Sequence, residues 1–228
     1  RGRAEEEGGG TDYRRPRRIP HVPHFPSPSL PPPSAMITLR TDWCPPGSDT
    51  TYVAGSLLVT TMSAVMASDF SDVLVMFTPT PAKSLSATTS TKDYIVLSVL
   101  EDVRTTLVLW KRGDDGTWTN IPAPEDAVRV GEDVSLGNVN RDDAHDNAVF
   151  LWRNGYLVPE TLELVADVGT SLAQGEPLKA GPAHFDAAGL IVEQNFCSSA
   201  DGTRIPYFVI RRADAPLDGL NPTLLDAY

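Results

Sequence analysis

Short runs of β-forming residues, separated by turn residues, constrain the fold of this chain more than any other feature. The runs are rich in Val, Leu, Ile, Thr and aromatic residues, and comprise Ile37–Arg40, Val73–Phe77, Tyr94–Leu100, Thr105–Lys111, Ala148–Trp152 and Leu162–Ala166. Turn signals such as Pro45-Pro46-Gly47 and Gly113-Asp114-Asp115-Gly116 lie between them. Antiparallel strands at short spacing, without alternating helices, indicate a sandwich, a barrel or a propeller, and periodicity does not choose among these three.

One helix is expected before residue 160. It would span Gly55–Ala67, where Leu58, Met62, Val65 and Met66 lie near helical spacing.

The C-terminal part predicts a β-hairpin. Its strands are Gly189–Phe196 and Arg204–Arg211, and the Asp201-Gly202 pair between them is a strong hairpin signal. A polar loop then leads to Thr223-Leu224-Leu225, which has the character of the start of a buried strand. Because a domain does not close in the middle of a strand, we expect the chain to be truncated there.

Composition and charge exclude some classes of partner. The apolar content of 41% and charged content of 21% suit a soluble globular protein. The formal charge of −11 divides into +2 for residues 1–35 and −13 for the remainder. A net charge of −13 on residues 36–228 repels nucleic acid and anionic lipid. In addition, no run of apolar residues approaches the roughly 20 that span a bilayer. Neither nucleic acid nor a membrane is an expected partner.

Residues 1–35 have low complexity. A Glu-Gly run is followed by RRPRR and a Pro-rich stretch, a composition with little means of building a core. The segment is predicted to be a disordered tail; a basic address or anion-binding patch is the alternative. Cys44 and Cys197 form no metal-type spacing, and we expect reduced, packed thiols rather than one disulfide.

The segment Ser199–Tyr228 resembles the entry to the catalytic domain of the prolyl oligopeptidase family. The matching motifs are Asp201-Gly202-Thr203, Ile205-Pro206, Leu217-Asp218-Gly219 and Pro222-Thr223-Leu224-Leu225. Upstream segments resemble the late propeller of bacterial-type members, namely 39–43, 54–58, 77–80, 97–103 and 179–185. The resemblance covers about residues 36–228.

This resemblance implies a mainly β fold in two parts. Residues 36–186 would form the last blades of a seven-bladed β-propeller, and residues 187–228 the first strands of a truncated α/β-hydrolase domain. The implied activity is that of a cytoplasmic serine endopeptidase without cofactors. Its expected partners are short proline-containing peptides, cleaved after proline by a Ser-His-Asp triad. The oligomeric state is not predicted.

The triad is expected to lie beyond Tyr228, so that the chain alone is inactive. The nearest approach to the Gly-x-Ser-x-Gly elbow is Gly169–Ala173, which is predicted to be a surface loop. Tyr228 occupies the position of the family's tyrosine whose hydroxyl stabilises the oxyanion, a role typically worth about 3 kcal/mol. A terminal strand residue without function is the alternative interpretation of Tyr228.

Other candidate residues favour structural roles. Asp142, Asp143, His145 and Asp146 lack the spacing of a cation loop and predict an acidic turn. His184 is interpreted as a linker residue and His21 and His24 as part of the tail. The tryptophans are predicted to pack within blades, although some could line a substrate channel; they are Trp43, Trp110, Trp118 and Trp152.

A non-catalytic propeller-type interaction module is the alternative function, because the chain contains no triad. An incomplete propeller exposes strand edges, which disfavours this alternative.

Overall fold

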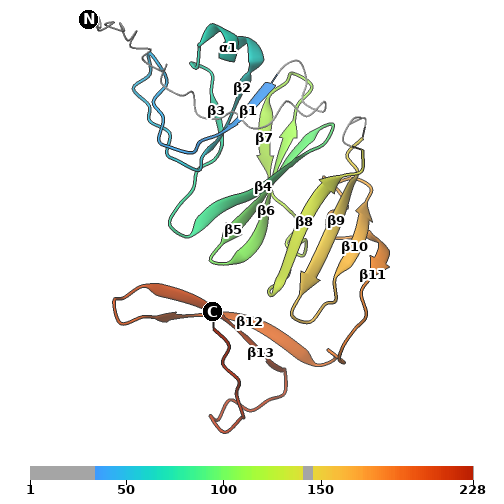
Figure 1. The fold of residues 1–228 in the computed structure, drawn as a ribbon. Coiled ribbons are helices and arrows are strands. Elements are labelled where there is room, and N and C mark those ends of the chain that lie inside the picture. Colours follow the sequence, from blue (N-terminus) through green and yellow to red (C-terminus); the bar gives the residue numbers. More distant parts are fainter. Residues whose placement is uncertain (1–33, 141–145, 228) are drawn as a thin grey trace, which may run out of the picture.

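A computed structural model describes residues 34–140 and 146–227 of the chain, which form three antiparallel sheets followed by a hairpin (Figure 1). The first sheet consists of β1 (Ser34–Thr38), β2 (Leu57–Thr61) and β3 (Leu74–Phe77). The second consists of β4 (Lys83–Ser90), β5 (Tyr94–Glu101), β6 (Arg104–Arg112) and β7 (Trp118–Ile121). The third consists of β8 (Glu132–Asn138), β9 (Val149–Gly155), β10 (Thr161–Val165) and β11 (Glu176–Ala180).

Strand β5 lies at the centre of the packing because it is buried on both faces. Successive side chains of a strand point to opposite faces of the sheet. Ile95, Leu97 and Val99 therefore pack toward the first sheet, whereas Tyr94 and Val96 pack toward the third. The almost continuous apolar sequence YIVLSVL is what a strand between two sheets requires.

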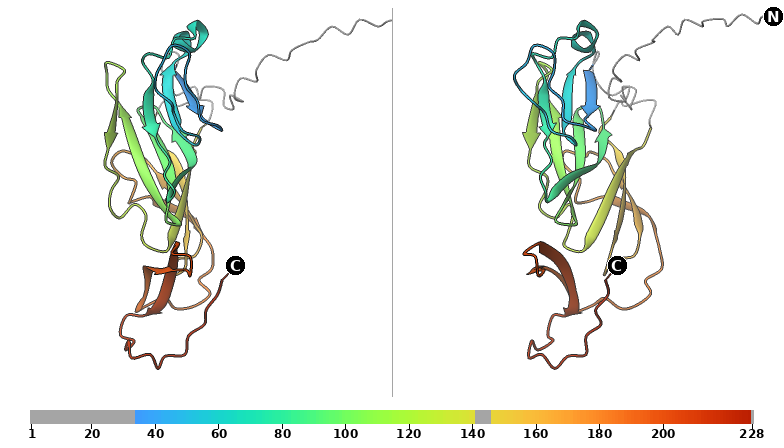
Figure 2. Two further views of the ribbon diagram at one scale, coloured as in Figure 1. Left: turned by 90° about the vertical axis from the view of Figure 1, so that its left-hand side faces the viewer. Right: turned by 60° about the vertical axis from the view of Figure 1, so that its left-hand side comes forward.

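Two separate apolar cores result. The core between the first and second sheets contains Leu57, Val59, Met76, Phe77, Ile95, Leu97 and Val99. The core between the second and third sheets contains Tyr94, Val96, Leu107, Leu109, Ala127, Val134, Val149, Leu151, Val165, Val168 and Leu172. The sheets therefore stack face to face, as Figure 2 shows, in the manner of neighbouring propeller blades. Of the three fold classes that the sequence left open, namely sandwich, barrel and propeller, the structure is therefore a partial propeller.

A polar clamp joins the second and third sheets as well. The Asn147 side-chain oxygen accepts hydrogen bonds from the Thr91 hydroxyl at 3.0 Å and the Asp93 backbone N–H at 2.9 Å. The Asn147 amide group donates to the Asp93 carboxylate at 3.0 Å. One side chain therefore holds the β4–β5 turn against the start of β9.

The predicted helix is wrong over its first half. Leu57–Thr61 form β2, and only Met62–Ala67 form the helix α1. Four successive residues of β2 are buried, which the single apolar face of a helix cannot provide. The Thr61 hydroxyl caps α1 by accepting a hydrogen bond from the Ala64 N–H at 3.1 Å.

The predicted hairpin is confirmed. Strands β12 (Leu190–Ser198) and β13 (Arg204–Arg212) pair without interruption from Leu190↔Arg212 to Ser198↔Arg204. In the turn, the Asp201 carboxylate accepts hydrogen bonds from the Ser199 hydroxyl and, at 3.0 Å, from the Thr203 N–H. These bonds lower the pKa of Asp201 to about 2.

Two sequence expectations at the ends of the described region need correction. Thr223–Leu225 is not a buried strand, since Leu224 and Leu225 lie outside any strand and are 93% and 88% exposed. Residues 1–33 of the predicted tail lie outside the described residues, and Ser34 and Ala35 belong to β1.

Replacement of Leu97 by alanine tests the first core. Leu97 is fully buried, so L97A is expected to lower the free energy of unfolding by about 2–5 kcal/mol. Urea denaturation measures this change. The control is L220A, because Leu220 is 84% exposed and its removal should change stability by no more than about 0.5 kcal/mol. Equal losses in the two variants would contradict the packing described here.

Titration of Asp201 tests the hairpin turn. Its carboxyl should protonate near pH 2 rather than near its unfolded value of about 3.9, as followed by NMR of the side-chain carbon. Because the folded-state pKa is the lower one, the turn's contribution to stability is complete above the unfolded pKa. It is lost as pH falls through about 2. S199A should raise the midpoint, and a wild-type midpoint near 3.9 would show that the turn bonds are absent.

Candidate functional site

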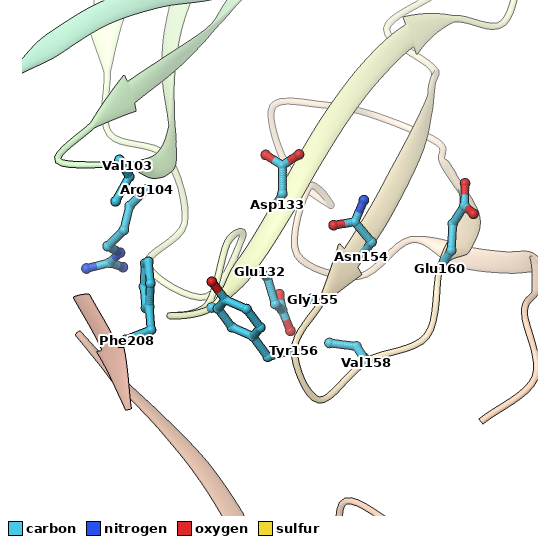
Figure 3. A pocket seen from close by; sticks show the side chains of 11 residues that line it. Val103, Arg104, Glu132, Asp133, Asn154, Gly155, Tyr156, Val158, Glu160 and Phe208 are labelled. Atoms are coloured by element: carbon cyan, nitrogen blue, oxygen red, sulfur yellow. The ribbon is translucent and has the colours of Figure 1, made fainter. Parts of the chain in front are cut away.

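The hairpin β12–β13 lies across the ends of the second and third sheets (Figures 1 and 2). The β5–β6 turn, the β7–β8 connection and the β9–β10 connection meet the hairpin at this end. A cavity of about 510 Å³ lies between them and is lined by Val103, Arg104, Gly131, Glu132, Asp133, Asn154, Gly155, Tyr156, Val158, Glu160 and Phe208 (Figure 3). A second hollow of about 420 Å³ continues beside Leu190–Val192.

One wall of the cavity is aromatic and joins the hairpin to the third sheet. The rings of Tyr156 and Phe208 lie with their centroids 5.4 Å apart. Gly131 permits this approach, because a Cβ atom there would lie 2.7 Å from Val192 and 3.0 Å from Tyr156. Gly131 also has a φ of +80°, a conformation that side chains rarely adopt. A side chain at residue 131 would therefore push the hairpin away from the sheet.

A buried ion cluster underlies the cavity. Arg153 is 7% exposed and donates to the Glu132 carboxylate at 2.7 Å and to the Glu163 carboxylate at 3.1 Å. It also donates to the Ala127 carbonyl at 3.0 Å. Burial opposes the charge of Arg153, but the hydrogen bonds with Glu132 and Glu163 outweigh this effect and raise its pKa. The Glu132 carboxylate that lines the cavity is therefore already paired with Arg153.

The remaining polar groups make the cavity rim acidic. Besides the Glu132 carboxylate, which is paired with Arg153, Asp133 and Glu160 contribute two carboxylates to the lining, against the single cation of Arg104. The Asp133 carboxylate accepts a hydrogen bond from the Thr105 hydroxyl, which fixes it at the rim. The lining contains no Ser, Cys or His side chain. On its own, this lining offers hydrogen-bond acceptors and aromatic surface to a ligand, but no nucleophile with its base.

Several sequence candidates lie outside the part of the chain that the structure describes. They are Tyr228, Asp142, Asp143, His145, His21 and His24. Asp146 is described and accepts a hydrogen bond from the Ala148 N–H at 3.1 Å, as a turn residue does. Within residues 34–140 and 146–227, no group of three or more His, Cys, Asp and Glu side chains could hold a metal ion.

The segment Gly169–Ala173 is a loop outside any strand or helix, as expected, with Thr170 exposed, but it is anchored in the core through Leu172. Leu172 is fully buried, and a Cβ at Gly169 would lie 2.2 Å from the Tyr94 ring. The Ser171 hydroxyl donates to the Asp167 carbonyl at 2.8 Å, within a local turn. Neither a buried strand leading into a helix nor a histidine partner accompanies this serine in the described region.

His184 is exposed in the connection between β11 and β12, as expected of a linker residue. It contributes to a small hollow of about 150 Å³.

The tryptophan side chains do not line the cavity. Trp110 and Trp118 pack against the first core, which confirms the prediction of blade packing for these two. Trp43 packs edge-on against Phe70 at 4.9 Å, and Trp152 is 38% exposed. The two cysteines, Cys44 and Cys197, are free but exposed, so the expectation of packed thiols is wrong.

Sequence reasoning missed several residues of the cleft because their local sequence carries little information about their role. Glu101-Asp102-Val103-Arg104 is a two-residue turn between apolar runs, but it lacks the Asn-Gly or Asp-Gly pair typical of such turns. Tyr156 and Gly131 lie in connections whose contacts with the hairpin depend on the tertiary fold.

The chain is similar in sequence to two curated peptidases. It is 34% identical over 195 residues to an uncharacterized peptidase of Sinorhizobium fredii, a match that covers 85% of this chain and 25% of the relative. It is 26% identical over 192 residues to an uncharacterized peptidase of Rickettsia prowazekii, covering 83% and 25%. The chain thus spans about a quarter of the length of the curated relatives it matches. Comparison with protein-family profiles gave no match.

Solved structures share the fold. A post-proline cleaving enzyme from Rickettsia typhi matches with a TM-score of 0.57 and 22% identity, over 83% of this chain and 26% of that one. Oligopeptidase B from Trypanosoma brucei, in a closed form with covalently bound antipain, matches with a TM-score of 0.53 and 16% identity, over 73% and 23%.

The stacked blade-like sheets with a hairpin across their ends are the fold that the chain shares with these solved structures. The chain is thus similar in sequence to peptidases and similar in fold to prolyl oligopeptidase-type enzymes. Among its described residues no helix is long and apolar enough to cross a membrane.

Replacement of Arg153 tests the buried cluster. R153M should lower the free energy of unfolding by about 3–5 kcal/mol, because it leaves the Glu132 and Glu163 carboxylates buried without their partner. Urea denaturation gives the value. R129M is the matched control, since the Arg129 side chain is 68% exposed and its pair with Glu132 should contribute at most about 1 kcal/mol. A loss below about 1 kcal/mol in R153M would show that Arg153 is solvated in solution.

Proposed function

We propose that this chain forms part of a prolyl oligopeptidase-type serine endopeptidase that hydrolyses short peptides after proline. The 34% identity to a peptidase over 85% of the chain carries this proposal. The fold shared with a post-proline cleaving enzyme supports the proposed specificity for cleavage after proline. The cleft between the sheets and the hairpin supports the proposal that the peptide binds there. The enzyme would act in the cytoplasm without a cofactor.

In this proposal residues 36–186 belong to the propeller and residues 187–228 open the hydrolase domain. The change in architecture supports the division, because the third sheet ends at Ala180 and the separate hairpin begins at Leu190. The acidic rim and the Tyr156–Phe208 wall lie where the two parts meet. The peptide would therefore bind between them.

The catalytic serine, aspartate and histidine would be supplied by sequence beyond Tyr228. The cavity lining supports this view, because its residues include no serine and no histidine. His184, the single histidine among the described residues, lies exposed in the β11–β12 connection. The proposed oxyanion donor is the hydroxyl of Tyr228, which itself lies outside the described residues.

Labelling and hydrolysis assays test the proposal. The 228-residue chain should neither react with a fluorophosphonate probe nor hydrolyse an N-blocked Gly-Pro-p-nitroanilide substrate. The longer product of the same reading frame should do both, and should contain Gly-Gly-Phe after Tyr228 and a later Gly-x-Ser-x-Gly. The Gly-Ala analogue and the serine-to-alanine variant of that elbow are the controls. A reading frame that closes without such an elbow would overturn the peptidase assignment for this gene.

The role of Tyr228 is tested in the same longer protein. Y228F should lower kcat by about 10²–10³-fold with little change in KM, because the lost hydroxyl would stabilise only the transition state. Y207F is a suitable control, since Tyr207 is 43% exposed on β13 and outside the cavity lining. Unchanged kcat in Y228F would remove Tyr228 from the site.

A further inference from the structure

The basic segment Tyr13–Phe25 is a sequence feature that neither the fold nor the proposed function uses. It contains four arginines, in the run Arg-Arg-Pro-Arg-Arg at residues 14–18, together with three prolines and no acidic residue. The remainder of the chain has the opposite sign, with a net charge of −13 over residues 36–228. Opposite charges attract the segment toward acidic surface of the body to which it is attached.

The acidic part of the cavity lining lies on the third sheet. Asp133 and Asn154 lie on β8 and β9, and Glu160 lies in the β9–β10 connection (Figure 3). The cation of the lining, Arg104, lies apart from them at the start of β6. The Asp133 carboxylate accepts a hydrogen bond from the Thr105 hydroxyl and keeps further acceptor positions. Among the described residues, no salt bridge neutralises Asp133 or Glu160.

Neighbouring carboxylates at this end of the molecule are, in contrast, paired within the fold. Glu132 is bonded to Arg153 at 2.7 Å. Asp102, in the β5–β6 turn, accepts a hydrogen bond from the Arg204 guanidinium of the hairpin at 2.8 Å. The acidic part of the cavity therefore differs from its surroundings, because its two carboxylates remain available to a cationic ligand.

The aromatic wall of the cavity suits the proline in the middle of the basic run. Proline-rich peptides bind grooves lined by aromatic rings, because their backbone is restricted before binding and loses little entropy. The Tyr156 and Phe208 rings, with centroids 5.4 Å apart, offer such a surface, and Tyr156 is 49% exposed. With Pro16 against these rings, the arginines on either side of it lie next to the acidic rim. The cavity volume of about 510 Å³ is in the range of ligand-binding sites.

The length of chain before Ser34 is sufficient for this contact. The first sheet, in which β1 begins at Ser34, stacks on the second, and the cavity lies at the end of the second sheet next to the hairpin (Figure 1). A nine-residue strand such as β6 is about 30 Å long, and stacked sheets are about 10 Å apart. Pro16 precedes Ser34 by 18 residues, which span up to about 60 Å. The basic run can therefore reach the cavity of its own chain.

We propose that the run Arg14–Arg18 binds in the cavity of the same chain as an internal ligand. Its guanidinium groups pair with the Asp133 and Glu160 carboxylates, and Pro16 lies against the aromatic wall. The segment then occupies the space in which a peptide would bind under the proposed function. The contact involves no hydrolysis, so its test does not depend on whether the peptidase assignment is correct.

Paramagnetic relaxation enhancement in the full 228-residue chain tests the contact. The C44S variant leaves Cys197, which is free and exposed on β12, as the single site for a nitroxide spin label. The backbone amide signals of residues 13–19 should lose intensity while the label is paramagnetic and recover it after reduction. Both R14Q/R15Q/R17Q/R18Q and D133N/E160Q should abolish this loss, because each removes one side of the ion pairs.

Two variants control for general attraction between the basic segment and the acidic body. R1Q/R3Q removes arginines of the same terminus outside the run, and D49N/D72N removes exposed carboxylates of the first sheet's connections. Both should keep the loss of intensity. Absence of the loss in the C44S parent, or its equal removal by D49N/D72N, would overturn the proposal. Loss in a mixture of spin-labelled unenriched chain and unlabelled ¹⁵N chain would also overturn it, since the segment would then bind a second copy.

Binding of a separate peptide gives an independent measurement. A fluorescein-labelled peptide with the sequence of residues 12–20 should bind R14Q/R15Q/R17Q/R18Q at least about 10-fold more tightly than wild type, because the tethered segment no longer competes. Adding D133N/E160Q to that variant should reverse the gain, as followed by fluorescence anisotropy. Equal affinities of the wild-type chain and R14Q/R15Q/R17Q/R18Q would show that the segment does not occupy the cavity.

Discussion

The burial of β5 on both faces is the constraint on which the rest of the structure depends. Ile95, Leu97 and Val99 fix the second sheet against the first, and Tyr94 and Val96 fix it against the third. A shift of one residue in the register of this strand would exchange the two sets between the cores. The same register sets the position of the β5–β6 turn, and hence the place at which the hairpin is held.

The buried cluster around Arg153 holds the strand ends that border the cleft. Arg153 lies on β9, and its partners Glu132 and Glu163 lie at the start of β8 and on β10, so three strands of one sheet are held at a common end. A buried charge that must keep its partners tolerates little displacement. Gly131 and Asp133 flank Glu132 directly, which ties both the hairpin contact and the acidic rim to the same cluster.

Sequence reasoning identified most of the apolar strands, although it assigned the apolar β2 to a helix, and it missed strands with polar sequences. The segments of β5, β6, β9 and β10 were predicted, but β4 with the sequence KSLSATTS and the wholly exposed β11 were not. These strands form because their backbones pair with apolar neighbours, a tertiary effect without a local pattern. The resemblance to a known family indicated the fold. The roles of Asp102, Gly131 and Arg153 could not be predicted, because they depend on tertiary contacts that the spacing of residues in the sequence does not encode.

The distribution of charge in the cleft bears on where hydrolysis could occur. On the sheet side, the Glu132 carboxylate is paired with Arg153, and the Asp133 carboxylate accepts a hydrogen bond from the Thr105 hydroxyl. The opposite boundary is formed by Phe208 of the hairpin. In the proposed peptidase, the hairpin opens the hydrolase part, so the catalytic groups would belong to the hairpin side of the cleft. The sheets would then supply the acidic and aromatic surface against which a peptide could lie.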